Sequence, residues 1–286
     1  MNTGPLQFPL VGRLCDDAAV FPPGNSTLEQ ALSAHLKQRR SAHRDLVDPL
    51  VLAFTHLDRL PGLVAVWPAR SFTLAVTTPL AQLRQAMITA RAIPAAQLVS
   101  LEIGLPDEIA ADDLVPAVEA AVEGHTGVTV YIEVPRDARR DALLRALAGT
   151  GRLAKFLTGG VRAELYPDES ELAASVLAAV RAEVPFKATA GMHHALRNTD
   201  PQTGFEQHGF LNLLTATGAA SEGADEAVLT ELLADRDGAR VAERMRALPA
   251  TVRESFRSFG SCSIADPVVE LADLGLIPPD LTRDLL

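Results

Sequence analysis

The chain has 286 residues, 48% of them hydrophobic, and its formal net charge at pH 7 is −10, values typical of one large α/β unit. An acidic chain without a basic stripe is a poor partner for nucleic acid, and no apolar run reaches the roughly 20 residues that cross a bilayer. The first ten residues lack a signal-peptide pattern and the two cysteines, Cys15 and Cys262, are far apart, so we expect a cytoplasmic protein without a membrane partner or a disulfide framework.

Apolar, β-branched runs alternate with stretches of helical periodicity along most of the chain. We predict eight strands, at residues 50–55, 72–77, 98–103, 128–134, 153–157, 186–190, 210–214 and 256–261. Asp168 with Glu171, and Ser26 with Glu29, have the spacing of helix capping boxes, which supports helices between the strands. Strand–helix alternation of this kind predicts an α/β fold, a (β/α)8 TIM barrel.

The predicted organisation is a single domain over residues 1–286. A helical N-terminal extension occupies residues 1–45 and the barrel occupies residues 46–286. The main rival is an open, doubly wound sheet, which usually begins with a Gly-rich phosphate turn. The first turns of this chain do not fit G-x-G-x-x-G, so we favour the barrel and expect no cofactor. Apolar faces on the outer helices permit a homo-oligomer.

Lysine is rare in this sequence, and its positions are informative. Of the 26 basic residues, only Lys37, Lys155 and Lys187 are lysine, and the last two lie inside apolar strands, where a buried amine is costly unless it is paired. Glu102 and Glu133 lie at the ends of two other predicted strands. Because the chemistry of such barrels collects at the C-terminal ends of the strands, we expect the four groups to form one mutually neutralising cluster there.

Two neighbouring lysines have a specific chemical use. Burial and a second ammonium group both lower the pKa of an amine, and the free amine can attack a carbonyl to form a Schiff base. We predict Lys187 as the nucleophile, Lys155 as its electrostatic activator and Glu133 as the acid–base, with Glu102 beside them. The predicted function is a carbon–carbon lyase acting on a small carbonyl compound, phosphorylated or not.

Two short motifs resemble a known family. "FKATAG", residues 186–191, is similar to the "KTSTG" stretch of deoxyribose-phosphate aldolase, and "KFLTGGVR", residues 155–162, resembles that family's second-lysine segment "K-x-A-G-G-V/I-R". The resemblance implies a class I (Schiff-base) aldolase on a TIM barrel, with Lys187 forming the Schiff base. It also implies that Gly159, Gly160 and Arg162 lie near a phosphate or other anion. The two motifs occur in the opposite order to the family's.

Further site candidates lie on or directly after the last three predicted strands. His193 and His194 come directly after Lys187's strand, and at most one of two adjacent histidines should share its site. Residues 192–209 form a candidate lid whose Arg197 could bind a carboxylate or phosphate. The predicted substrate-binding residues are Gly159, Gly160, Arg162, Arg197, Asn212 on strand seven, and Arg257 and Ser261 on strand eight.

Two other functions stay open. Glu102, Glu133 and a histidine could hold a divalent metal in a lyase or isomerase, although no metal-binding motif is present. The barrel could also be a binding protein whose buried charges are structural. Asp16 and Asp17 precede a tight turn and would join the site only if the N-terminal segment lies over the barrel mouth. Cys262 fits a small buried hydrophobic position.

Overall fold

The computed structural model describes residues 8–106, 109–124 and 127–285. Eight strands form a closed barrel: β1 (Cys15–Asp17), β2 (Val47–Ala53), β3 (Phe72–Pro79), β4 (Ala96–Gly104), β5 (Thr129–Glu133), β6 (Leu153–Leu157), β7 (Phe186–Thr189) and β10 (Phe256–Ser261). Around the barrel the order is β1-β10-β7-β6-β5-β4-β3-β2, and every neighbouring pair is parallel. The predicted (β/α)8 fold is confirmed.

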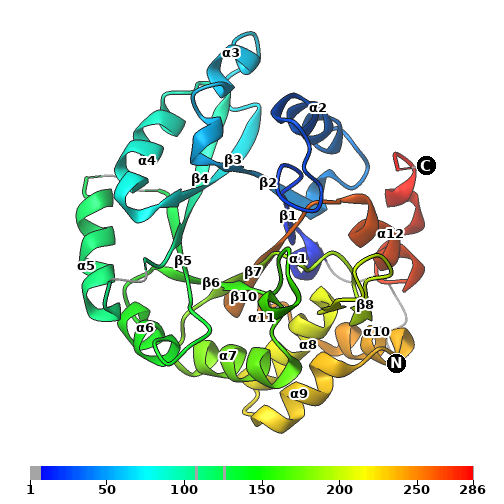
Figure 1. Ribbon diagram of the computed structural model, residues 1–286. Coiled ribbons are helices and arrows are strands. Elements are labelled where there is room, and N and C mark those ends of the chain that lie inside the picture. Colours follow the sequence, from blue (N-terminus) through cyan, green and yellow to red (C-terminus); the bar gives the residue numbers. More distant parts are fainter. Residues whose placement is uncertain (1–7, 107–108, 125–126, 286) are drawn as a thin grey trace.

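The described helices pack around this ring of strands (Figure 1). They are α1 (Phe8–Val11), α2 (Leu28–Gln38), α3 (Leu60–Val64), α4 (Leu83–Arg91), α5 (Ala111–Val122), α6 (Arg140–Leu147), α7 (Glu169–Arg181), α8 (Phe210–Ser221), α9 (Glu226–Ala234), α10 (Gly238–Ala247), α11 (Val252–Ser255) and α12 (Ala265–Asp273). The short α1 and α11 lie near the centre of the ring in the view of Figure 1. The Asp168 side chain accepts from the Glu171 amide and caps α7, as predicted. The cap of α2 is Thr27 rather than Ser26, because Thr27 and Gln30 form the reciprocal capping box.

One predicted strand is wrong. Residues 210–214 begin the helix α8, and ten of its twelve residues are buried. A helix that is buried on all sides carries no polar face, so its apolar run has the same appearance as a buried strand in the sequence. Asn212, assigned to strand seven, therefore lies on a helix outside the barrel wall.

The strand that replaces it is β1, which lies inside the segment predicted to be an extension. Its three residues, Cys15–Asp17, pair with β10 on one side and β2 on the other. The barrel thus begins near residue 15, and α2 is its first outer helix. A three-residue strand that contains two aspartates has too little apolar character to be recognised from the sequence.

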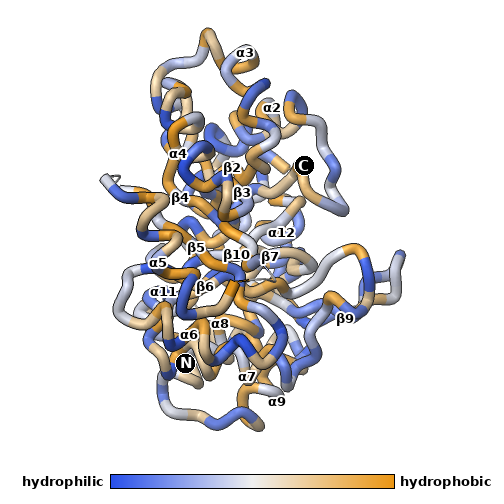
Figure 2. Tube along the Cα trace, turned by 60° about the vertical axis from the view of Figure 1, so that its left-hand side comes forward, coloured by the Kyte–Doolittle hydropathy of each residue, from blue (hydrophilic) through white to orange (hydrophobic). Residues whose placement is uncertain are grey.

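The hydrophobic core fills the barrel and the layer beneath the helices. Figure 2 shows hydrophobic segments along the central strands and hydrophilic ones in peripheral loops, such as the one that carries β9 (Glu206–Gln207). Phe186 contacts Phe156 and Phe256 of the adjacent strands, with ring centroids 5.1 and 5.4 Å apart. Phe156 and Phe186 directly neighbour Lys155 and Lys187 in their strands, so their rings point to the opposite face and pack outside the strands, beneath the helices.

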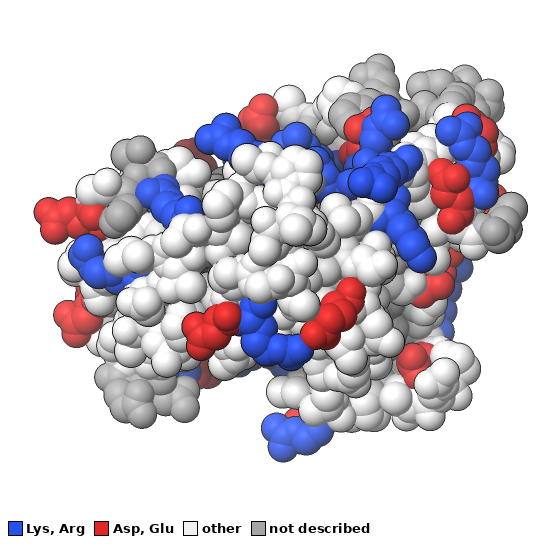
Figure 3. Space-filling view, turned by 90° about the horizontal axis from the view of Figure 1, so that it is seen from above, with Lys and Arg blue, Asp and Glu red and all other residues white. Residues whose placement is uncertain are grey.

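The surface carries charges of both signs. On the face in Figure 3, basic and acidic side chains form small mixed groups among broad uncharged areas. Among the described residues, none of the helices combines the length and the hydrophobicity that a membrane span requires.

Candidate active site

Strand register brings the predicted charged residues together. Lys155 of β6 is the register partner of Lys187 of β7 on one side and of Glu133 of β5 on the other. Glu102 of β4 is paired with Tyr131 of β5. Neighbouring strands lie about 4.8 Å apart, so these side chains leave the barrel wall within a small region. The predicted convergence of the two lysines and two glutamates is therefore observed.

Lys187 lies at the bottom of this region, with only 1% of its side chain exposed. Its ammonium group donates to Glu102 Oε1 at 2.6 Å and to a carboxylate oxygen of Asp16 from β1. Ser258 of β10 donates to the same oxygen of Asp16 at 2.9 Å. The Tyr131 ring lies beneath the amine, 5.2 Å from Nζ to the ring centroid. We call Lys187, Asp16 and Glu102 the floor.

The electrostatics of the floor differ from the expectation. Burial by itself would lower the pKa of Lys187, but the carboxylates of Asp16 and Glu102 outweigh burial and raise it above the usual value. Burial raises the pKa of Asp16 to about 6, against the opposing effect of Lys187. Burial alone would raise the pKa of Glu102, but the ammonium groups of Lys187 and Lys155 outweigh burial and lower this pKa. The prediction that the pKa of Lys187 is depressed is therefore wrong.

Lys155 also contacts two carboxylates, but at longer distances. Its Nζ lies 3.2 Å from Glu133 Oε2 and 3.7 Å from Glu102 Oε2. The side chain of Glu133 is 29% exposed, whereas that of Lys155 is 8% exposed. Glu102 thus bridges the two amines, with one oxygen for each. We call Lys155 and Glu133 the opening, because solvent reaches the cluster there.

Two cavities meet at the opening. The apolar cavity, about 430 Å³, is lined by Ala18, Phe21, Pro22, Val51, Thr77, Glu102, Lys155, Leu157, Gly160, Val161, Leu165, Lys187, Thr189, Ala190, His193, Gly260 and Cys262. The hydroxyl-lined cavity, about 560 Å³, is lined by Ala53, Phe54, Thr55, Thr77, Thr78, Pro79, Leu80, Gln82, Glu102, Gly104, Leu105, Pro106, Glu133 and Lys155. Lys155 borders both cavities, Lys187 only the first and Glu133 only the second.

The adjacent residues Asp16 and Asp17 have separate roles. Successive side chains of a strand point to opposite faces, so Asp16 points into the barrel and Asp17 points out of it. Asp17 Oδ2 lies 2.9 Å from Nδ1 of the buried His35 on α2. Asp16 is a site residue whose role the sequence left undecided, while Asp17 fastens α2 to β1.

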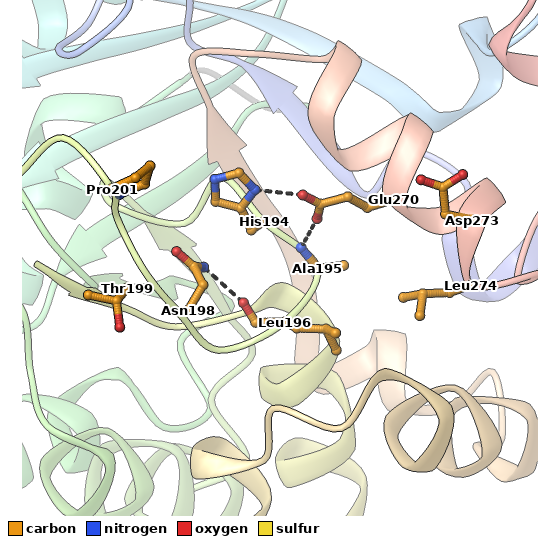
Figure 4. A pocket seen from close by; sticks show the side chains of 9 residues that line it. All are labelled: His194, Ala195, Leu196, Asn198, Thr199, Pro201, Glu270, Asp273 and Leu274. Carbon is orange, nitrogen blue, oxygen red and sulfur yellow. Dashed lines mark hydrogen bonds and ion pairs between the residues drawn. The ribbon is translucent and has the colours of Figure 1, made fainter. Parts of the chain in front are cut away.

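The two adjacent histidines also separate. His193 lines the apolar cavity, with Nδ1 3.5 Å from Cys262 Sγ, and burial lowers its pKa. Burial likewise raises the pKa of the Cys262 thiol. His194 turns away toward α12, where Nδ1 lies 2.6 Å from Glu270 Oε1, and this hydrogen bond raises the His194 pKa (Figure 4). His194 therefore lies outside the lysine site. The Cys262–His193 contact was not predicted, because the two residues are far apart in the sequence.

The loop after β7 is fastened to its surroundings. It contains a small hairpin of β8 (Asn198–Thr199) and β9. Arg197, nearly buried, pairs with Glu169 at 2.8 Å and Glu206 at 3.3 Å. Asn212 accepts from the Arg197 amide at 2.8 Å and donates to two carbonyl oxygens near the end of α9. Both predicted substrate-binding residues thus hold protein segments together, and neither lines the two cavities at the opening.

Protein side chains pack against the predicted anion site, of which only Gly160 lines the apolar cavity. A side chain at Gly159 would meet Tyr166 at 2.5 Å, and one at Gly160 would meet Leu165 at the same distance. The glycines therefore let these two side chains pack onto the end of β6. Arg162 is 67% exposed and pairs with Glu164. Two residues of β10 also lie outside both cavities: Arg257 is exposed, and the hydroxyl of Ser261 donates to the Ser263 carbonyl at 2.7 Å.

Within residues 8–106, 109–124 and 127–285, no three His, Cys, Asp or Glu side chains converge in an arrangement that could hold a metal ion. Glu102 borders both cavities, but Glu133 borders only the hydroxyl-lined cavity and His193 only the apolar one. The ligand set suggested for a metal-dependent lyase is therefore not assembled among the described residues.

Comparison of the sequence with models of known protein families finds no match, and comparison with curated proteins finds none either. The likeness to deoxyribose-phosphate aldolase rests on the two lysine motifs alone and stays a prediction. What the site can do must be argued from its own geometry.

Proposed function

We propose that this barrel is a carbon–carbon lyase of the aldolase type and that Lys155, rather than Lys187, forms the Schiff base. One observation carries the proposal: two lysines stand in register on adjacent strands and share one carboxylate, Glu102, but only Lys155 borders both cavities. The proposal reverses the roles assigned to the two lysines from the sequence.

The contacts of the two amines support this reversal. An amine must lose a proton before it can attack a carbonyl. Lys187 is held as ammonium by Asp16 and Glu102, whose carboxylates raise its pKa. Lys155 has only longer contacts, and its nearest carboxylate, Glu133 at 3.2 Å, is partly exposed and can accept its proton. Lys187 then supplies a fixed positive charge next to the reacting amine.

The residues can carry the first half of the reaction without another group. Glu133 takes a proton from the Lys155 ammonium, and the free amine adds to the substrate carbonyl carbon. After proton transfer within this adduct, the carboxylic acid of Glu133 protonates its hydroxyl group, and water leaves. The products are an iminium on Lys155 and an ionised Glu133, so protons and charge balance.

The second half breaks the carbon–carbon bond. Glu133 accepts the proton of the substrate's β-hydroxyl group, the bond between the α- and β-carbons breaks, and its electron pair moves into the iminium. An aldehyde leaves and an enamine stays on Lys155. Glu133 then protonates the enamine carbon, and water hydrolyses the resulting iminium by the reverse of its formation. Condensation is the same sequence read backwards.

Reductive trapping tests the proposal, and the chain is well suited to it because it contains only three lysines. We expect borohydride with glyceraldehyde, dihydroxyacetone or benzaldehyde to leave a reduced adduct at Lys155, which peptide mass spectrometry detects in excess of the background label on the exposed Lys37. Lys155→Met should abolish this adduct, and Lys37→Met should retain it as the matched control. An adduct at Lys187 would contradict the assignment of roles. If neither buried lysine is modified by any of these probes, the Schiff-base function is wrong.

A further inference from the structure

The charges of the floor and the opening together restrict which carbonyl compound the site accepts. The cluster contains two ammonium groups, Lys155 and Lys187, and three carboxylates, Asp16, Glu102 and Glu133. Its formal charge is therefore −1, and transfer of a proton from Lys155 to Glu133 leaves that total unchanged. A second negative charge brought near such a cluster is repelled.

The walls supply no counter-charge for an anion. Among the residues that the structure describes, no arginine lines either cavity. Arg162 points to Glu164 in solvent, and Arg197 is paired with Glu169 and Glu206. At the end of β6, Gly160 lines the apolar cavity, but Tyr166 and Leu165 pack against Gly159 and Gly160, and the backbone there carries no formal charge.

The same cavity offers hydrocarbon. Phe21 and Pro22 from the loop after β1, Val51 from β2, and Leu157, Val161 and Leu165 around the end of β6 line it. Val161 is 68% exposed at this wall, an arrangement that gives an entering apolar group a hydrophobic surface to cover.

We infer that the substrate is an uncharged carbonyl compound with an apolar substituent, which lies in the apolar cavity while its carbonyl carbon reaches Lys155 Nζ. Its other, polar fragment occupies the hydroxyl-lined cavity, where Thr55, Thr77, Thr78 and Gln82 provide hydrogen-bonding groups. The inference rests on the proposed Schiff base at Lys155 and excludes phosphorylated and carboxylated compounds from the apolar cavity.

A pair of probes that differ by one charge tests it. Methyl 4-formylbenzoate and 4-formylbenzoate are similar in size, and each is incubated with the protein and cyanoborohydride at pH 7. Labelling of the exposed Lys37 in the same sample reports the intrinsic reactivity of each aldehyde. We expect the ratio of label on Lys155 to label on Lys37 to be at least about tenfold higher for the ester, which corresponds to about 1.4 kcal/mol.

Two outcomes separate the possible failures. Equal ratios for both probes, with label present on Lys155, would overturn the substrate class and leave the Schiff base intact. No label on Lys155 with either probe would overturn the proposed function and this inference with it.

A charge added at the cavity wall provides a second test. Val161→Arg should raise the ratio for 4-formylbenzoate by about threefold or more, because the guanidinium offsets the negative cluster. Val66→Arg, at a position 92% exposed and outside both cavities, is the matched control and should leave the ratio unchanged. An unchanged ratio in Val161→Arg would contradict binding of the substituent against this wall.

Discussion

The floor and the opening contain the same residue types, a lysine beside carboxylates, and differ in burial and in the length of the lysine–carboxylate contacts. At the floor, Lys187 is 1% exposed and donates to two carboxylates that are almost fully buried. At the opening, Lys155 is 8% exposed and its nearest partner, Glu133, is 29% exposed. Glu102 of the floor also contacts Lys155 at the opening, at 3.7 Å.

The difference teaches that a buried lysine is not by itself a reactive one. Burial favours the neutral amine, but two carboxylates within hydrogen-bonding distance favour the ammonium more strongly, and at Lys187 the second effect wins. The reactive position is instead the neighbour that has weaker partners and faces the cavities. Three measurements test how far this contrast holds, beginning with the largest expected effect.

Removing each lysine in turn should give unequal losses of stability. Lys187→Met leaves Asp16 buried with only Ser258 as a partner, and we expect a loss of about 3–5 kcal/mol in the free energy of unfolding. Lys155→Met leaves Glu102 paired with Lys187 and Glu133 partly hydrated, so we expect about 1 kcal/mol. Urea unfolding of both variants measures the difference; equal losses would mean that floor and opening are energetically alike.

The pH dependence of the free energy of unfolding should reveal the raised pKa of Asp16 at the floor. Its pKa is raised from 3.8 to about 6, so the folded state holds this proton more tightly than the unfolded state. The stabilisation is complete below about pH 4 and is lost as the pH rises through about 6. The free energy of unfolding of Asp16→Asn, measured relative to the wild type, should therefore rise by up to about 3 kcal/mol as the pH goes from 4 to 7. A constant difference between the two proteins over this range would refute the assignment.

The pair of His194 and Glu270 extends the comparison of burial to a more exposed ion pair, in which both side chains are about one-third exposed. The hydrogen bond raises the His194 pKa. The contribution of the His194–Glu270 pair to stability is therefore present below the pKa of histidine in the unfolded chain, near 6.5, and is lost at higher pH. Solvent screening keeps it small, so His194→Gln should cost about 0.5 kcal/mol at pH 6. At pH 9 the variant and the wild type should have the same thermal midpoint; a persistent gap would indicate a packing role instead.

Much of the barrel was readable from the sequence because its strands are apolar runs bounded by turns. The strands β2 to β7 and β10 lie close to their predicted positions, and the predicted capping spacing of Asp168 and Glu171 begins α7. The errors are the two cases in which local pattern and tertiary environment disagree. The buried helix α8 has no polar face, and the short strand β1 has almost no apolar one.

The sequence by itself determined the fold class and the convergence of Lys155, Lys187, Glu102 and Glu133, because consecutive parallel strands place the residues at their C-terminal ends at one mouth. Only the tertiary structure decided that Asp16 joins them, that His193 and not His194 faces the cavity, and that the candidate arginines lie outside the cavities. It also decided which lysine is held as ammonium. The physical reason is that charge state and direction depend on the groups a side chain meets in space, and Asp16 meets Lys187 across 171 residues of chain.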